Sequence, residues 1–102
     1  MTTPAPSPVR PVTCHVLKSW PVSFQAVVAG AKRCELRQDD RGGFSEGDLL
    51  VLQEWDPERA AYTGNVCLCT VTHVDAAGEA CTPVLRQAGY RLLSIVPVRT
   101  VE

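Results

Sequence analysis

A run of alternating charged side chains after a glycine is the part of the sequence best suited to chemistry. Lys32, Glu35 and Arg37 follow Gly30 closely, and in a strand Glu35 and Arg37 point to the same face. Arg37 could grip a phosphate with its planar fork, and Lys32 could act as a point charge beside it. Glu35 could accept hydrogen bonds from an exocyclic amine or a ribose hydroxyl. These residue types suit a ligand that carries both a phosphate and a base.

Aromatic side chains elsewhere could provide a stacking surface for such a base. Trp55 and Tyr62 flank a predicted hairpin, where exposure is plausible, and a stacked base is worth about 1–3 kcal/mol. Trp20 directly precedes Pro21, so we expect it to fold back on Phe24 as a lid on a helix. Trp55 and Tyr62 are therefore the aromatic candidates.

The same residues also have plainer interpretations. Glu35 and Arg37 could form a surface ion pair, which is typically worth about 0–1 kcal/mol, and residue types alone favour that interpretation. His15 and His73 are expected to be hydrogen-bonded strand residues rather than catalysts.

The five cysteines form no recognisable disulfide or metal pattern. Their number is odd and no CxxC pair occurs. Cys67 and Cys69 are two residues apart, so on a strand both thiols share one face. We expect buried, reduced thiols that pack as small apolar side chains, with no metal and no cofactor. The five are Cys14, Cys34, Cys67, Cys69 and Cys81.

Length and composition predict one globular domain. The chain has 102 residues, of which 45% are hydrophobic and 21% charged. No apolar run approaches the roughly 20 residues that cross a bilayer, and the first residues lack a secretory pattern, so we expect a cytoplasmic protein without membrane contact. The net charge of −1 does not indicate a general polyanion binder. Residues 1–41 nevertheless carry +3 and residues 42–102 carry −4, so an anion site belongs to the first part.

The elements that position these residues begin after a proline-rich segment. Residues 1–11 are expected to be a disordered tail, because closely spaced prolines favour a solvated chain. A strand follows over residues 12–19, and then a short helix over residues 21–29 with Ser19 as its cap and Gly30 as its stop. The helix carries one apolar stripe of Phe24, Val27 and Val28.

Four further strands are expected over residues 32–37, 49–55, 65–74 and 90–98. In the first of them, Cys34 and Leu36 should face the core and Glu35 the opposite, charged face. Residues 38–48 should form a loop that ends in a tight turn, and residues 79–89 could hold a short helical turn. Gly64 should close the hairpin, and Pro97 should mark the edge or the end of the last strand. This order predicts an α+β, mostly β fold, a small barrel of about five strands with the main helix packed at its end, as one domain over residues 12–102.

The stretch HVLKSWPVSFQAVVAGAKRCELRQDDRGGFSEGDLLVLQEWDPERAAYTG resembles the ASCH domain of the PUA-like superfamily, in particular a compact subfamily of phages and bacteria. The resemblance covers about residues 14–96. Its motifs are the HVLK segment, the G-x-K-x-x-E-x-R run, and the two pairs Asp40-Arg41 and Gly47-Asp48. The QEWDP and YTG segments of the hairpin narrow the resemblance to that subfamily.

The resemblance implies a barrel related to RNA-binding domains, with a cleft beside the helix that takes RNA or a nucleotide-like ligand. Lys32, Glu35 and Arg37 would line this cleft. The full set of candidate binding residues is Lys18, Lys32, Glu35, Arg37, Asp40, Arg41, Trp55 and Tyr62.

Catalysis is a second hypothesis, because some relatives cleave RNA or act on modified nucleosides. The amidohydrolase relatives resemble this run in having its lysine, but they carry a threonine nucleophile where Glu35 stands, and a carboxylate offers no comparable nucleophile. A ribonuclease would use Lys32 and Glu35 as its acid and base and Arg37 as a phosphate clamp. Ser19 and Thr63 supply further hydroxyls, although no spacing rule brings them to Lys32. A third hypothesis is a protein-interaction module, and the oligomeric state stays open.

Overall fold

The computed structural model describes residues 11–38, 43–76 and 89–102. Its elements are β1 (Cys14–Ser19), α1 (Pro21–Val28), β2 (Cys34–Gln38), β3 (Leu49–Asp56), β4 (Ala61–Ala76) and β5 (Tyr90–Val101). The predictions for the tail before Pro11, for Asp40 and Arg41, for Cys81 and for a helical turn within residues 79–88 lie outside the described residues.

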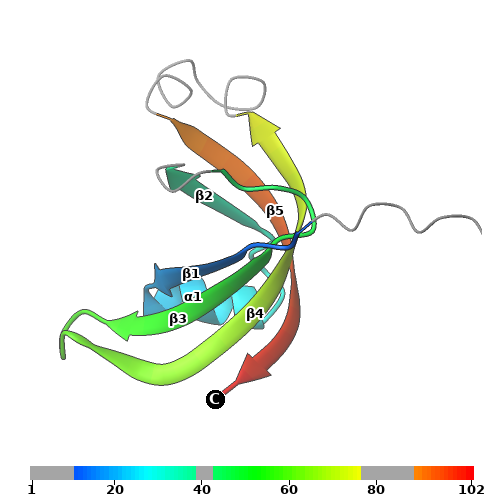
Figure 1. Cartoon of the computed structure of the whole chain (residues 1–102). Helices are drawn as coiled ribbons and strands as arrows, with labels where there is room; N and C mark the ends of the chain where they lie inside the picture. Colours follow the sequence, from blue (N-terminus) through cyan, green and yellow to red (C-terminus); the bar gives the residue numbers. More distant parts are fainter. Residues whose placement is uncertain (1–10, 39–42, 77–88) are drawn as a thin grey trace, which may run out of the picture.

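The five strands form one mixed sheet in the order β1-β3-β4-β5-β2. β1 pairs with β3 in parallel, and the other neighbours pair antiparallel. The sheet curls into a half-barrel, so that its two edge strands, β1 and β2, lie on the same side of the molecule (Figure 1). This architecture confirms the predicted mostly β fold with one short helix.

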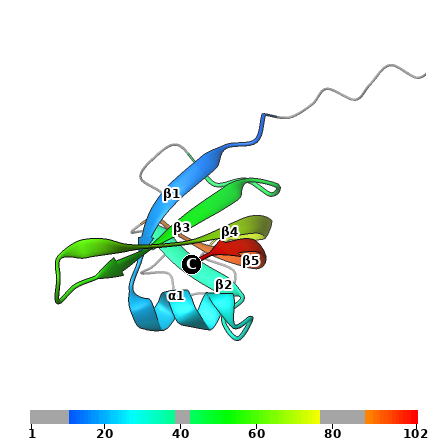
Figure 2. The same cartoon turned by 90° about the horizontal axis from the view of Figure 1, so that it is seen from below.

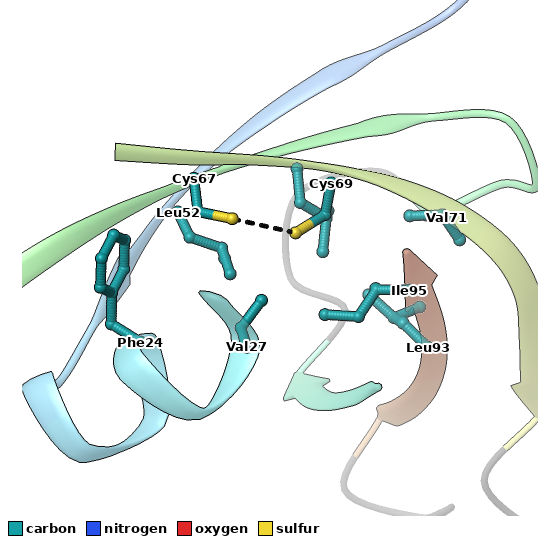
Figure 3. Packing of buried hydrophobic residues seen from close by; sticks show 9 residues of the cluster. Phe24, Val27, Leu52, Cys67, Cys69, Val71, Leu93 and Ile95 are labelled. Carbon is teal, nitrogen blue, oxygen red and sulfur yellow. Dashed lines mark hydrogen bonds between the residues drawn. The ribbon is translucent and has the colours of Figure 1, made fainter. Parts of the chain in front are cut away.

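The core lies between α1 and the concave side of the sheet, as its side chains show in Figure 3, and Figure 2 shows α1 alongside the sheet. Phe24 and Val27 of the helix are fully buried, and Val28 packs against them, which confirms the apolar stripe. The strands contribute side chains at alternate positions, because only one face of each strand points inward. These are Leu50, Leu52, Cys67, Cys69, Val71, Leu93 and Ile95.

The start of α1 differs from the prediction. Trp20 occupies the N-cap position without a side-chain hydrogen bond, and Ser19 still belongs to β1. Pro21 at the first turn has no backbone N–H to satisfy, which reduces the need for a cap. Trp20 is about half exposed rather than a buried lid.

The strands around the hairpin are longer than predicted. β3 and β4 are joined by a tight turn at residues 57–60, so Gly64 lies inside β4 instead of closing the connection. β5 continues past Pro97 to Val101. Pro97 is tolerated because β2 pairs only with residues 90–94, and because the register between β4 and β5 shifts opposite it.

Among the described residues, no helix has the length and apolar character that a membrane span requires.

Candidate functional site

The charged strand β2 faces the core with the side opposite to the one predicted. Glu35 is only 3% exposed, whereas Leu36 is 42% exposed and Cys34 is also exposed. The assignment of Cys34 and Leu36 to the core was wrong, because β2 is an edge strand whose inward position holds the buried carboxylate of Glu35. This carboxylate pairs with two cations, Lys32 and Arg37.

Lys32 and Arg37 hold Glu35 from two sides. Lys32 Nζ lies 3.1 Å from Glu35 Oε1, an ionic contact without hydrogen-bond geometry. Arg37 Nε donates a hydrogen bond of 3.1 Å to Glu35 Oε2. The Lys32 and Arg37 side chains remain 32% and 26% exposed. The structure therefore brings these three predicted residues together; we call them the inner cluster.

The end of α1 directs Lys32 into this cluster. Gly30 adopts φ +76°, and its N–H donates to the Val27 carbonyl. The N–H groups of Ala31 and Lys32 both donate to the Ala26 carbonyl at 3.0 Å. This Schellman-type turn folds the chain back over the helix. As a result, the Lys32 ammonium also donates to the hydroxyl of Ser23 on α1.

Arg37 also links the two edges of the half-barrel. Its Nη2 donates a hydrogen bond of 2.9 Å to the backbone carbonyl of Lys18 on β1. The five described strands show no backbone pairing between β1 and β2, so this side chain spans the opening of the sheet. The inner cluster thus lies where the barrel is left open.

Three other predicted residues form a second group, which we call the outer cluster. The Lys18 ammonium lies 3.7 Å from the ring centroid of Trp55 and 5.9 Å from that of Tyr62. Trp55 and Tyr62 are cross-strand partners whose ring centroids are 4.9 Å apart in an edge-on arrangement. The exposed ends of these residues combine a cation with aromatic surface.

The two clusters occupy opposite faces of the sheet. Glu54 and Thr63 contact each other on the inward side, so their neighbours Trp55 and Tyr62 point outward. Lys18 also points outward, since its neighbour Ser19 is buried. Sequence reasoning had assigned all these residues to one cleft. Strand alternation divides them, and only Lys18 contacts both groups.

Sequence reasoning missed a second buried carboxylate, Glu54. It accepts hydrogen bonds from Gln25 Nε2 at 3.1 Å, Thr63 Oγ1 at 2.9 Å and Asn65 Nδ2 at 3.0 Å. Burial raises the pKa of Glu54, but these three hydrogen bonds outweigh it and leave the pKa below its usual value. The sequence contains a signal for its burial, because Glu54 follows Leu50 and Leu52 at the alternate positions of β3 that point inward.

A third buried acid organises the turn before β3. Asp48 accepts hydrogen bonds from the His15 ring at 2.9 Å and from the backbone N–H groups of Thr13 and Ser45. Burial raises the pKa of Asp48, but the hydrogen bonds from His15, Thr13 and Ser45 outweigh this effect and leave the pKa below its usual value. His15 and Asp48 therefore stabilise the fold at a place separate from the inner cluster.

Of the remaining candidate groups, His73 and Thr63 have local partners, whereas the Ser19 hydroxyl has none within the described part of the chain. His73 contacts Glu46 and Asp75 on the surface, and these hydrogen bonds raise the pKa of His73. Thr63 donates to Glu54, and the buried Ser19 hydroxyl has no hydrogen-bond partner among the described residues.

Of the four cysteines that the structure describes, one pair matches the prediction. The Cys67 and Cys69 sulfur atoms lie 3.8 Å apart in the core. Burial, with the Cys67 thiol and the Glu35 carboxylate nearby, raises the pKa of Cys69 to about 12. Cys14 and Cys34 are exposed instead of buried, because they occupy the outward positions of the two edge strands.

Comparison with known proteins identifies the family of the chain. The model of the family described as a domain of unknown function, DUF3850, matches residues 14–95. The match spans most of the chain and includes both clusters, so the chain belongs to this family. A search of curated proteins gave no match.

Proposed function

We propose that this member of the DUF3850 family binds RNA or a nucleotide-like ligand, and that the inner cluster receives a phosphate. The observation that carries the proposal is that Lys32 and Arg37 are both fixed against one buried carboxylate, Glu35. Two cations against one anion leave a net positive charge in a chain whose overall charge is −1. Such a concentrated charge attracts an anion to this place on the surface.

The cations of the inner cluster keep donors for a ligand. The Arg37 guanidinium has more N–H groups than its contacts with Glu35 and the Lys18 carbonyl use. The Lys32 side chain is about one-third exposed while its ammonium contacts Glu35 and Ser23. Because Glu35 already orients both heads, binding a phosphate requires little further ordering of these long side chains.

The state of Glu35 favours binding over catalysis. A general base needs a free carboxylate oxygen within reach of the substrate proton. In this site Oε2 accepts a hydrogen bond from Arg37, and Oε1, which accepts none from the described residues, is buried beside the Lys32 ammonium, so neither oxygen is open to a substrate proton. We therefore assign Glu35 the role of positioning the two cations. The resemblance to ASCH domains, which is itself part of the proposal, adds the expectation that the ligand is RNA.

Removal of each cation tests the site directly. Lys32→Ala and Arg37→Ala should each weaken binding of a fluorescein-labelled single-stranded RNA by about tenfold in anisotropy titrations at low salt, because each loses a charge-assisted contact. Each should also reduce the slope of log affinity against log salt by about one. Arg99→Ala is the matched control, since it removes an exposed cation at the far end of β5.

Unchanged affinity in both cluster variants, with folding verified by circular dichroism, would reject the inner cluster as a phosphate site. Incubation of the wild-type protein with the same RNA checks the alternative. Cleavage that Glu35→Gln abolishes and Arg99→Ala preserves would make the protein a ribonuclease and remove the purely positioning role of Glu35.

A further inference from the structure

We infer that the ligand is a single strand of nucleic acid that crosses the β1 edge, with a phosphate on the inner cluster and a base on the outer cluster. The inference rests on the proposed function and makes it more specific. It excludes a mononucleotide as the complete ligand, because one nucleotide cannot contact two opposite faces of a sheet at once.

The geometry of Lys18 carries this inference. Its backbone carbonyl accepts the Arg37 hydrogen bond at 2.9 Å, while its ammonium lies 3.7 Å from the Trp55 ring centroid. A single residue of the edge strand thus joins the two clusters, although they occupy opposite faces. A continuous chain that passes over β1 at Lys18 would meet both.

The outer cluster has the chemistry of a stacking platform for one nucleotide. Tyr62 is 51% exposed and held edge-on by Trp55, so it can offer ring surface in a fixed orientation. The Lys18 ammonium beside these rings can neutralise the phosphate that accompanies a stacked base. The nearby Asp56 carboxylate is engaged by the N–H groups of Glu58 and Arg59 in the hairpin turn. It therefore stabilises the turn that carries the platform.

The chemistry selects a single strand over a duplex. In a duplex the bases stack on one another and are paired, so their faces are not accessible to Tyr62. Unpaired bases can splay out and stack on an aromatic ring, and each base offers a ring face regardless of its identity. The platform should therefore be tolerant of sequence.

The test compares ligand length across two sets of variants. The probes are adenosine monophosphate and a labelled RNA of about eight nucleotides, which falls within the site sizes of small barrel domains. Tyr62→Ala should weaken octamer binding by about tenfold and leave monophosphate binding unchanged, whereas Tyr62→Phe, which keeps the ring, should retain both. Lys18→Met serves as a second variant, because it keeps the backbone carbonyl and removes only the ammonium. Lys32→Ala should weaken the binding of both probes.

The possible results separate the two ideas. If Lys32→Ala weakens both probes while Tyr62→Ala and Lys18→Met leave the octamer unaffected, the crossing strand is rejected and the phosphate site stands. If Lys32→Ala and Arg37→Ala both leave the affinity for either probe unchanged, both ideas fail. Equal affinity for double-stranded RNA would also overturn the inference, as would capture of a protein partner by a chain that binds no oligonucleotide. A single-stranded DNA of the same length serves as a further probe, and equal affinity for it would support a single strand that is bound without contacts to its 2′-hydroxyls.

Discussion

Two buried glutamates, Glu35 and Glu54, are stabilised in opposite ways on the inward side of the same sheet. Both are connected to α1, Glu35 through Lys32 and its contact with Ser23, and Glu54 directly through Gln25. Glu35 is paired with two cations that remain partly exposed. Glu54 accepts hydrogen bonds from neutral amide and hydroxyl groups only.

The difference separates a structural acid from an acid that organises a site. The donors around Glu54 are consumed by the protein, so nothing charged remains for a ligand. The cations around Glu35 keep exposed donors and a net positive charge, which makes that cluster suited to an anion. A buried carboxylate alone is therefore no indication of function; the charge of its partners is.

The largest predicted effect is on stability and concerns Glu54. Glu54→Ala should lower the free energy of unfolding by about 3 kcal/mol, because it removes a buried carboxylate together with the three hydrogen bonds that it accepts from Gln25, Thr63 and Asn65. Glu35→Ala should cost only about 1 kcal/mol, since the freed heads of Lys32 and Arg37 can be rehydrated. Urea denaturation followed by circular dichroism measures both. A greater loss of unfolding free energy in Glu35→Ala than in Glu54→Ala would contradict the assignment of Glu54 as the structural acid.

The second prediction concerns acid. The folded-state pKa of Glu54 lies below its ordinary value of 4.5, so the unfolded chain takes up a proton first as the pH falls. The stabilisation is complete above pH 4.5 and is lost as the pH drops through the folded pKa, by at most about 1.4 kcal/mol per pH unit for one proton. Unfolding measured at a series of pH values between roughly pH 3 and pH 6 should show this decrease in stability.

Glu54→Gln is the matched variant for that titration. It keeps one acceptor oxygen and removes the proton-binding group, so the decrease should become shallower. The remaining acid dependence should come in part from Asp48, whose pKa is also lowered, from 3.8. An identical pH profile in the wild type and in Glu54→Gln would refute the assigned role.

The third prediction concerns the turn that delivers Lys32. Gly30→Ala should cost about 1 kcal/mol because alanine resists φ +76°. It should also weaken phosphate binding, since the displaced turn withdraws Lys32 from Glu35. Gly47→Ala is the control, as Gly47 has φ +89° in a turn next to Asp48. A comparable loss of stability with unchanged affinity is expected there, and equal loss of affinity in both variants would contradict the argument.

The fold was accessible from the sequence because its signals are local. The apolar spacing of α1 predicted its buried face, Gly30 predicted its end, and residues 49–55 predicted the strand β3. The inner cluster was also predicted as a group, since Lys32, Glu35 and Arg37 are near neighbours in the chain.

The rest depends on distant contacts that local patterns do not contain. The inward turn of Glu35 reflects its position on an edge strand, where Lys32 from the turn after α1 and Arg37 from β2 itself supply cations in place of apolar neighbours. The division of the candidates between two faces follows from the pairing of β1 with β3, which brings Lys18 beside Gln53 and close to Trp55. A polar residue that continues an inward period, as Glu54 does, was the signal most easily overlooked.

The smallest predicted effect tests whether Lys18 belongs with the available cations or with the structural groups. Lys18→Met should lower the free energy of unfolding by only about 0.5 kcal/mol, because an exposed cation over an aromatic ring contributes little and the methionine stem still covers Trp55. Arg99→Met gives the background for losing an exposed cation from a strand. A loss of unfolding free energy for Lys18→Met close to that of Glu54→Ala would show that Lys18 stabilises the fold, as the donors around Glu54 do. A small loss means that its ammonium costs little to redirect, which is the property that a phosphate-binding residue at the strand edge requires.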